Sequence, residues 1–316
     1  MADSTLHTTK PDSPIYLFQI GKGGVGKSTL SALLALAHAR AGRRVSLLSL
    51  DPAHNQSDIF QMTFGESAVP AAERLRVREP DIDRWIARVL AETQQRMREN
   101  YTYLTALNLD QYFRVLRHAP GLEEFALRAV FQQTVHTETD AEIIVVDLPP
   151  TALALRFFSS PTTAGIWTEE LLRLRRTIKE KRDIITRIRF GGREFEQDRV
   201  LVRLEEERTA NEALRTLFSD PARARVTLVI NPDLLSWMEA RRIVTALEAV
   251  GITPGAVAVN KWTGHMDPHP FPSELSHIPR LHMPLAATPL VGIDRLLKYL
   301  DELAIDLAVP DGAPRA

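Results

Sequence analysis

Nine consecutive residues near the start of the chain have the types and the spacing of a phosphate-binding loop. They read Gly-Lys-Gly-Gly-Val-Gly-Lys-Ser-Thr and lie between an apolar, β-like run and a long apolar helical pattern. With these flanks they satisfy the strand, G-x-x-x-x-G-K-S/T, helix pattern of such loops. Glycines let the backbone bend so that successive N–H groups point into one concavity, which holds a polyphosphate. The residues expected to bind the nucleotide are Gly21, Gly23, Gly24, Val25, Gly26, Lys27, Ser28 and Thr29.

Two side chains of this loop are expected to act on the phosphates directly. Lys27 would reach the β- and γ-phosphates as a positive charge, and the Ser28 hydroxyl would ligate the Mg²⁺ that neutralises them. The helix that begins near Lys27 aims its positive end at the same anion. The alternative, a chance glycine-rich turn, is disfavoured because the motif, its flanks and its position agree. The loop therefore predicts a site for ATP and Mg²⁺.

Two carboxylates end apolar runs that follow the loop. Asp51 comes after residues 45–50, and Asp147 comes after residues 142–146. Ligands of parallel sheets bind at the carboxyl ends of the strands, so both carboxylates are expected beside the phosphates. We expect Asp51 to position the attacking water, and both residues to act on the Mg²⁺ through its bound water rather than as direct ligands. The alternative for each is structural, as a turn with Pro52 or as the end of a buried strand.

Lys22 follows the first glycine, where an ordinary phosphate loop needs no cation. The stretch Lys-Gly-Gly-Val-Gly-Lys-Ser-Thr resembles the deviant phosphate loop of the superclass of MinD, ParA, the nitrogenase iron protein and ArsA. Those proteins are dimers whose signature lysine crosses the interface. The resemblance implies a homodimer in which Lys22 stabilises charge on the nucleotide of the second copy, as an arginine finger does elsewhere. The alternative is a solvated surface lysine.

The next motifs narrow the resemblance to the ArsA branch. Residues 51–60, Asp-Pro-Ala-His-Asn-Gln-Ser-Asp-Ile-Phe, look like its switch I, especially that of its tail-anchored-protein targeting ATPases. Within it, His54 is either a base or a turn histidine. Residues 147–156 resemble switch II, Asp-Thr-Ala-Pro-Thr-Gly-His-Thr-Leu-Arg. The family's first threonine, its glycine and its histidine are replaced by Leu148, Ala152 and Leu153. Alanine in place of glycine predicts a stiffer switch.

Asn260 follows the apolar run 255–259. A side-chain amide offers both a donor and an acceptor to a base, and the resemblance implies that Asn260 reads the adenine edge. The alternative is a turn cap after a strand. Pro284 and Leu285 are similar to the Pro-Leu that begins the family's segment near the base. Pro289 stands where the family has a glutamate before its closing helix.

Apolar runs beginning at Ile15, Val45, Glu142, Val226 and Gly255 alternate with helical patterns. This order predicts an α/β fold with a doubly wound, mainly parallel sheet, and a further short strand is expected at 75–78. We expect one phosphate-loop ATPase domain over 14–308, with disordered tails at 1–13 and 309–316. Helical insertions at 81–135 and 160–217 are expected to form a helical subdomain, either as solvated hairpins or as a client surface. Met97 is the only methionine in either, so Leu, Ile and Phe would have to line an apolar groove.

Composition removes several functions. The 316 residues include no cysteine, which excludes disulfides, thiolate zinc sites and cysteine-bound iron–sulfur clusters. Lys and Arg number 39 against 40 Asp and Glu, so the balance of charge favours no nucleic acid partner. No apolar run approaches the roughly 18 to 20 residues of a membrane span, and the first residues do not resemble a signal peptide, so we expect a cytoplasmic protein. His265 and His269 are more simply exposed loop residues than metal ligands.

These features together predict a homodimer that hydrolyses Mg-ATP and couples it to a conformational change of a helical client surface. The implied role is targeting or transport of a hydrophobic membrane-protein segment, or energising a membrane pump. An arsenite pump needs metalloid-binding cysteines, which the chain lacks. One alternative is a slow ATP-gated dimerisation switch or scaffold, motivated by the altered switch II. Another is a ParA- or MinD-like positioning ATPase, which near-neutral charge and the lack of a terminal basic amphipathic helix disfavour.

Overall fold

The computed structural model describes residues 13–100, 109–190, 198–264, 275–303 and 307–308. Residues 1–12 and 309–316 of the two expected tails lie outside the described residues, as do His265 and His269. Within the described residues, no helix is both long enough and apolar enough to cross a membrane.

An eight-stranded sheet lies at the centre of the fold, in the order β3-β4-β2-β5-β1-β6-β7-β8. Neighbouring strands are parallel except for β3, which is antiparallel to β4. The strands are β1 (Ile15–Ile20), β2 (Val45–Ser49), β3 (Val69–Ala72), β4 (Leu75–Arg78), β5 (Ile143–Asp147), β6 (Ala224–Ile230), β7 (Ala256–Trp262) and β8 (Arg280–Pro284). The predicted fold class is confirmed, while the edge strands β3 and β8 were not predicted.

Helices cover both faces of the sheet, which explains why its central strands are almost continuously apolar. One face packs against α1 (Lys27–Arg40), α2 (Asn55–Phe60) and α9 (Ile293–Glu302). On the other face, β1 contributes Tyr16 and Phe18 to an aromatic cluster with Phe131, Phe157 and Phe218. That face also carries α8 (Leu234–Glu248).

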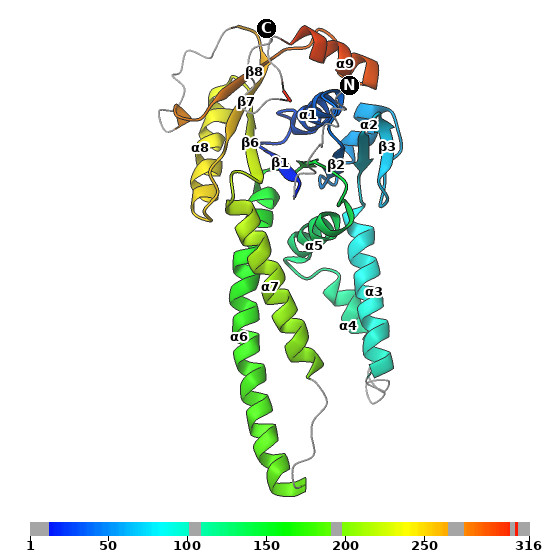
Figure 1. The fold of residues 1–316 in the computed structure, drawn as a ribbon, viewed down its shortest axis with the longest axis vertical. Coiled ribbons are helices and arrows are strands. Elements are labelled where there is room, and N and C mark those ends of the chain that lie inside the picture. The colour runs from blue at the N-terminus through cyan, green and yellow to red at the C-terminus, as the bar shows by residue number, and fades with distance from the viewer. Residues whose placement is uncertain (1–12, 101–108, 191–197, 265–274, 304–306, 309–316) are drawn as a thin grey trace, which may run out of the picture.

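The remaining helices extend away from the sheet in the lower half of Figure 1. They are α3 (Ile82–Asn100), α4 (Leu109–Leu116), α5 (Leu122–Thr137), α6 (Thr151–Phe190) and α7 (Arg199–Ser219). Helix α5 also covers the sheet, because its Leu127, Val130 and Phe131 are buried in the core. Helix α6 has 40 residues and forms a long antiparallel pair with α7. It begins at Thr151, inside the segment that resembles switch II, where Ala152 and Leu153 are strong helix formers.

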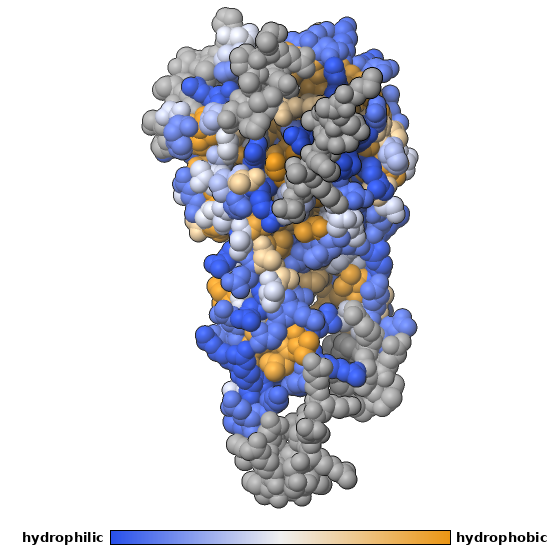
Figure 2. All heavy atoms as spheres, in the orientation of Figure 1, coloured by the Kyte–Doolittle hydropathy of each residue, from blue (hydrophilic) through white to orange (hydrophobic). Residues whose placement is uncertain are grey.

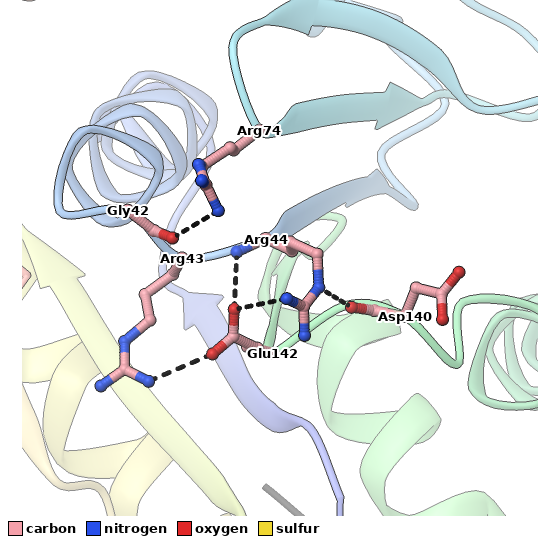
Figure 3. Close-up of polar contacts among 6 residues, drawn as sticks. All are labelled: Gly42, Arg43, Arg44, Arg74, Asp140 and Glu142. Carbon is pink, nitrogen blue, oxygen red and sulfur yellow. Dashed lines mark hydrogen bonds and ion pairs between the residues drawn. The ribbon is translucent and has the colours of Figure 1, made fainter. Parts of the chain in front are cut away.

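The amino ends of β2 and β5 are joined by a group of polar contacts around Glu142 (Figure 3). The Glu142 carboxylate accepts hydrogen bonds from the Arg44 backbone N–H at 3.0 Å and from Arg43 Nη1 at 3.2 Å. Arg44 Nε donates to the carbonyl of Asp140 at 2.6 Å, and Arg74 Nη1 donates to that of Gly42 at 3.0 Å. These contacts stabilise the sheet at the amino ends of its central strands. The candidate site lies at the opposite side, at the carboxyl ends of the strands.

Candidate functional site

The phosphate loop connects β1 to α1, and steric constraints explain its glycines. A Cβ on Gly21 would lie 2.2 Å from the carbonyl oxygen of Val229, and one on Gly26 would lie 2.2 Å from Asn260 Nδ2. Gly24 and Gly26 have φ values of +79° and +95°, in the left-handed region that side chains rarely adopt. A Cβ on Gly23 would meet nothing within 4 Å. The loop therefore needs glycine for space at one end and for backbone conformation in its second half.

Lys27 and Ser28 lie in the first turn of α1, and both are buried. Lys27 Nζ donates to the carbonyl of Lys22 at 3.3 Å, so the ammonium lies over the loop. Burial lowers the pKa of Lys27, and the carboxylates of Asp147, Asp51 and Glu239 oppose that shift. The Lys27 ammonium is largely shielded from solvent and is placed to bind a phosphate oxygen.

Asp147 ends β5 and is completely buried. Its Oδ2 accepts a hydrogen bond from Gln56 Nε2 at 2.9 Å, and its Oδ1 lies 3.3 Å from the Ser31 hydroxyl. The same hydroxyl lies 2.9 Å from Gln19 Oε1. Burial raises the pKa of Asp147 to about 6, against the opposing effect of its hydrogen bond with Gln56. A carboxylate that is costly to ionise in the protein alone is well placed to interact with a nearby cation.

Asp51 lies two residues after the end of β2, in the turn that leads into α2. It is 8% exposed, and its Oδ1 accepts a hydrogen bond from the Ala53 N–H at 3.1 Å. His54 lies in this turn with φ +51°, and its N–H donates to the Asp51 carbonyl at 3.3 Å. That geometry fits the turn interpretation of His54. The amide of Asn55 then lies 3.4 Å from the Ser28 hydroxyl, which brings the segment resembling switch I onto the phosphate loop.

Sequence reasoning missed two residues that hold this segment. The buried amide of Gln56 bridges two elements, since its Nε2 also donates to the Ser28 carbonyl at 3.0 Å. The buried carboxylate of Glu79 accepts hydrogen bonds from the N–H groups of Gln56 and Ser57, at 2.8 and 3.0 Å. A position directly after the expected strand at 75–78 was the available signal for Glu79. No local pattern distinguishes Gln56 from a surface glutamine.

A cavity of about 360 Å³ opens beside the loop. Asn260, two residues before the end of β7, and Pro284, at the end of β8, both line it, together with Thr29 and Tyr299. Asn260 Nδ2 donates to the carbonyl of Val25 at 2.7 Å, which leaves the amide oxygen and its second N–H for a ligand. Leu30, Leu33, Met283 and Leu290 supply apolar walls. The cavity can hold a planar, mostly apolar group with a polar edge, such as a nucleobase.

Lys22 belongs to the loop, but within the described ranges its side chain makes no ion pair or hydrogen bond with the other predicted side chains. Its side chain is exposed, and its ammonium has no hydrogen-bond or ion-pair partner among the residues that the structure describes. The other predicted residues gather at the carboxyl ends of β1, β2, β5, β7 and β8. No group of three or more His, Cys, Asp or Glu in the described ranges could hold a metal ion. The Ser28 hydroxyl with the two nearby carboxylates fits instead a Mg²⁺ that is also held by phosphate oxygens.

The known proteins to which this chain is similar are ATPases. The model of a family described as anion-transporting ATPase matches residues 15–269. Putative arsenical pump-driving ATPase 2 of Aquifex aeolicus is 28% identical over 76% of this chain and 78% of its own. ATPase GET3A of Arabidopsis thaliana is 30% identical over 78% of this chain and 66% of its own. An ATPase ASNA1 homolog of Entamoeba histolytica is 27% identical over 78% of this chain and 76% of its own.

Proposed function

Since the chain belongs to the anion-transporting ATPase family and is an ATPase, we propose that it is a cytosolic homodimer that uses Mg-ATP to reshape a helical surface. This surface would carry a hydrophobic segment of a membrane protein or engage a membrane pump. The observation that carries the proposal is the bridge made by Gln56, because it links the segment resembling switch I both to the phosphate loop and to Asp147.

The proposed chemistry gives each of these side chains a role. Lys27 and the loop N–H groups bind the β- and γ-phosphates, and Ser28 would hold the Mg²⁺. Bound Mg²⁺ supplies the positive charge that neutralises these phosphates. Asp51 orients the attacking water, and Asp147 would help to hold the Mg²⁺ through its bound water. In the homodimer, the exposed ammonium of Lys22 would reach the nucleotide bound by the second copy and stabilise its charge.

Helix α6 offers a route from the site to the client. It begins four residues after Asp147, and its first turns are tied to other helices. Thr151 Oγ1 donates to Glu239 Oε1 on α8 at 2.6 Å, and Arg156 Nη1 donates to Glu124 Oε1 on α5 at 2.8 Å. A shift at Asp147 would therefore act on the first turns of a helix of 40 residues, which has Pro161 in its interior and whose far end lies well away from the sheet (Figure 1).

The client surface is proposed on one face of α6. Trp167, Leu171, Leu174 and Ile178 follow one another at helical spacing and are 68%, 44%, 56% and 45% exposed. We call these four residues the α6 stripe. A cavity of about 310 Å³ between α5 and α6 adjoins it and is lined by Phe125 and Trp167. Hydrophobic patches also interrupt the hydrophilic surface of this half of the molecule in Figure 2. An exposed row of this kind fits the apolar face of a helical segment.

One experiment tests the mechanism. The mass of the protein in solution would be measured with no nucleotide, with ADP and with a slowly hydrolysed ATP analogue, alongside ATP turnover. We expect the analogue to create or tighten a dimer in the wild type and not in Lys22→Ala. Lys27→Ala should lose turnover. A mass that ignores nucleotide and Lys22 would contradict the dimer mechanism.

A second function, an ATP-gated dimerisation scaffold with slow turnover, is favoured by one observation. Helix α6 starts within the segment that resembles switch II, and Ala152 replaces the family's glycine there. A helical switch has less conformational freedom than a glycine-containing loop. The scaffold function predicts nucleotide-dependent dimers whose turnover no hydrophobic peptide accelerates. The targeting function predicts that such a peptide changes the turnover.

A further inference from the structure

Strand β7 carries a bulge beside the phosphate loop. Val259 pairs with His282 and Trp262 pairs with Pro284, so Asn260 and Lys261 lie opposite the single residue between those partners. Lys261 has φ +55°, an uncommon conformation for a residue with a side chain. In a regular strand, successive side chains point to opposite faces of the sheet. A bulge redirects side chains locally, and bulges are frequent next to active sites.

Because of this bulge, two consecutive side chains of β7 reach the same loop. Asn260 Nδ2 donates to the carbonyl of Val25 at 2.7 Å, and Lys261 Nζ donates to the carbonyl of Gly24 at 3.1 Å. A trans peptide unit is planar, and its C=O and N–H point in opposite directions. Holding the carbonyl of Gly24 therefore also orients the N–H of Val25. Holding the carbonyl of Val25 likewise orients the N–H of Gly26.

These two N–H groups are available for a ligand. Neither donates to a backbone or side-chain acceptor among the residues that the structure describes. Both belong to the stretch of the loop in which Gly24 and Gly26 take left-handed conformations. Successive N–H groups aimed at one concavity form the anion site of such loops.

We propose that Lys261 is a positioning residue of the phosphate loop, which turns the Val25 N–H toward the phosphates by holding the Gly24 carbonyl. Asn260 does the same for the next peptide while it lines the base cavity. This inference concerns nucleotide binding within one protomer, so its outcome is separate from that of the dimer and client proposals.

The test separates an effect on the loop from a contact with the base. Affinities for Mg-ADP and for Mg-tripolyphosphate, which has no base, would be measured by competition against a fluorescent ADP analogue. The proteins are the wild type, Lys261→Met, Lys261→Arg and, as control, Lys298→Met. Lys298 is an exposed helix lysine that pairs with Glu302 at 3.9 Å. Lys261→Asn adds a second uncharged variant that tolerates positive φ, in case the Met variant does not fold.

We expect Lys261→Met to weaken the binding of ADP and the binding of tripolyphosphate by the same factor, about tenfold. This is the effect expected from the loss of one charge-assisted hydrogen bond. Lys261→Arg should recover most of the affinity, and Lys298→Met should match the wild type. In turnover assays the loss should fall on KM more than on kcat. The proposal is overturned if tripolyphosphate binds Lys261→Met as tightly as it binds the wild type. It is also overturned if Lys261→Arg is as weak as Lys261→Met.

Discussion

Replacing Asp147 with asparagine should stabilise the nucleotide-free protein while it impairs the site. Burial raises the pKa of Asp147 from its usual 3.8 to about 6. Since one pKa unit corresponds to about 1.4 kcal/mol, this rise costs the folded protein about 3 kcal/mol once the carboxylate is ionised. Asparagine keeps the shape and can accept from Gln56 through its oxygen, while its N–H₂ group can donate to the Ser31 hydroxyl.

The sign of the pH dependence follows from the raised pKa. Between pH 3.8 and about 6 the folded state holds a proton on Asp147 that the unfolded state has lost. The contribution of this residue to stability therefore falls as the pH rises through this window, and it is constant above it. The advantage of Asp147→Asn should be near zero at the acid end, grow across the window and reach a plateau of about 3 kcal/mol at neutral pH.

Urea denaturation at several pH values from 4 to 8, without nucleotide, measures this difference. Asp83→Asn, at an exposed position in the first turn of α3, controls for the loss of one negative charge. With Mg-ADP present the order should reverse, because ligand binding stabilises the wild type more than a variant with a weakened metal site. A difference between Asp147→Asn and wild type that does not change between pH 4 and 7 would refute the reasoning.

Three further predictions follow from single residues. Gly26→Ala should abolish ADP binding, because its Cβ would lie 2.2 Å from Asn260 Nδ2, whereas Gly23→Ala should bind almost as the wild type does in the same titration. Glu142→Gln should lose about 1 kcal/mol at pH 7 by urea denaturation. The Arg44 N–H lowers the pKa of Glu142, so this loss is present above the ordinary glutamate pKa and disappears as the pH falls through the lowered one. Leu174→Ser should weaken capture of an apolar helical peptide about tenfold in a pull-down titration, and an unchanged capture would remove the α6 stripe from the client surface.

The sequence was most informative where the site is built from residues that are close together along the chain. The phosphate loop, the strands β1, β2 and β5, and the positions of Asp51 just after β2 and of Asp147 at the end of β5 could all be predicted, because spacing along the chain determines where they lie. Strand β3 could not, since its four residues include a proline at an antiparallel edge. Strand β8 is also an edge strand, and its alternating exposed and buried residues gave only a weak pattern.

Residues that act through distant partners could not be predicted. Gln56 bonds to Asp147, 91 positions away, and Lys261 bonds to Gly24, 237 positions away. Neither residue has a local pattern that separates it from a solvated side chain. The bulge that redirects Lys261 depends on the register between β7 and β8, and β8 itself was not predicted. The roles of such side chains can be recognised only in the folded structure, where the sheet brings distant strands together.

The position where α6 begins decides how a change at the nucleotide can reach the helices. With a flexible switch, the movement that follows loss of the γ-phosphate would be taken up by loop residues and would not reach α6. Here Asp147 is separated from the helix by only three residues, two of which are proline with fixed φ. A displacement of Asp147 therefore has to be taken up by the helix, which can bend at Pro161, or by its anchors at Glu239 and Glu124. A stiff connection transmits small movements but makes large ones costly, so we expect any client-dependent change to be a tilt of α6 rather than an unwinding of its first turn.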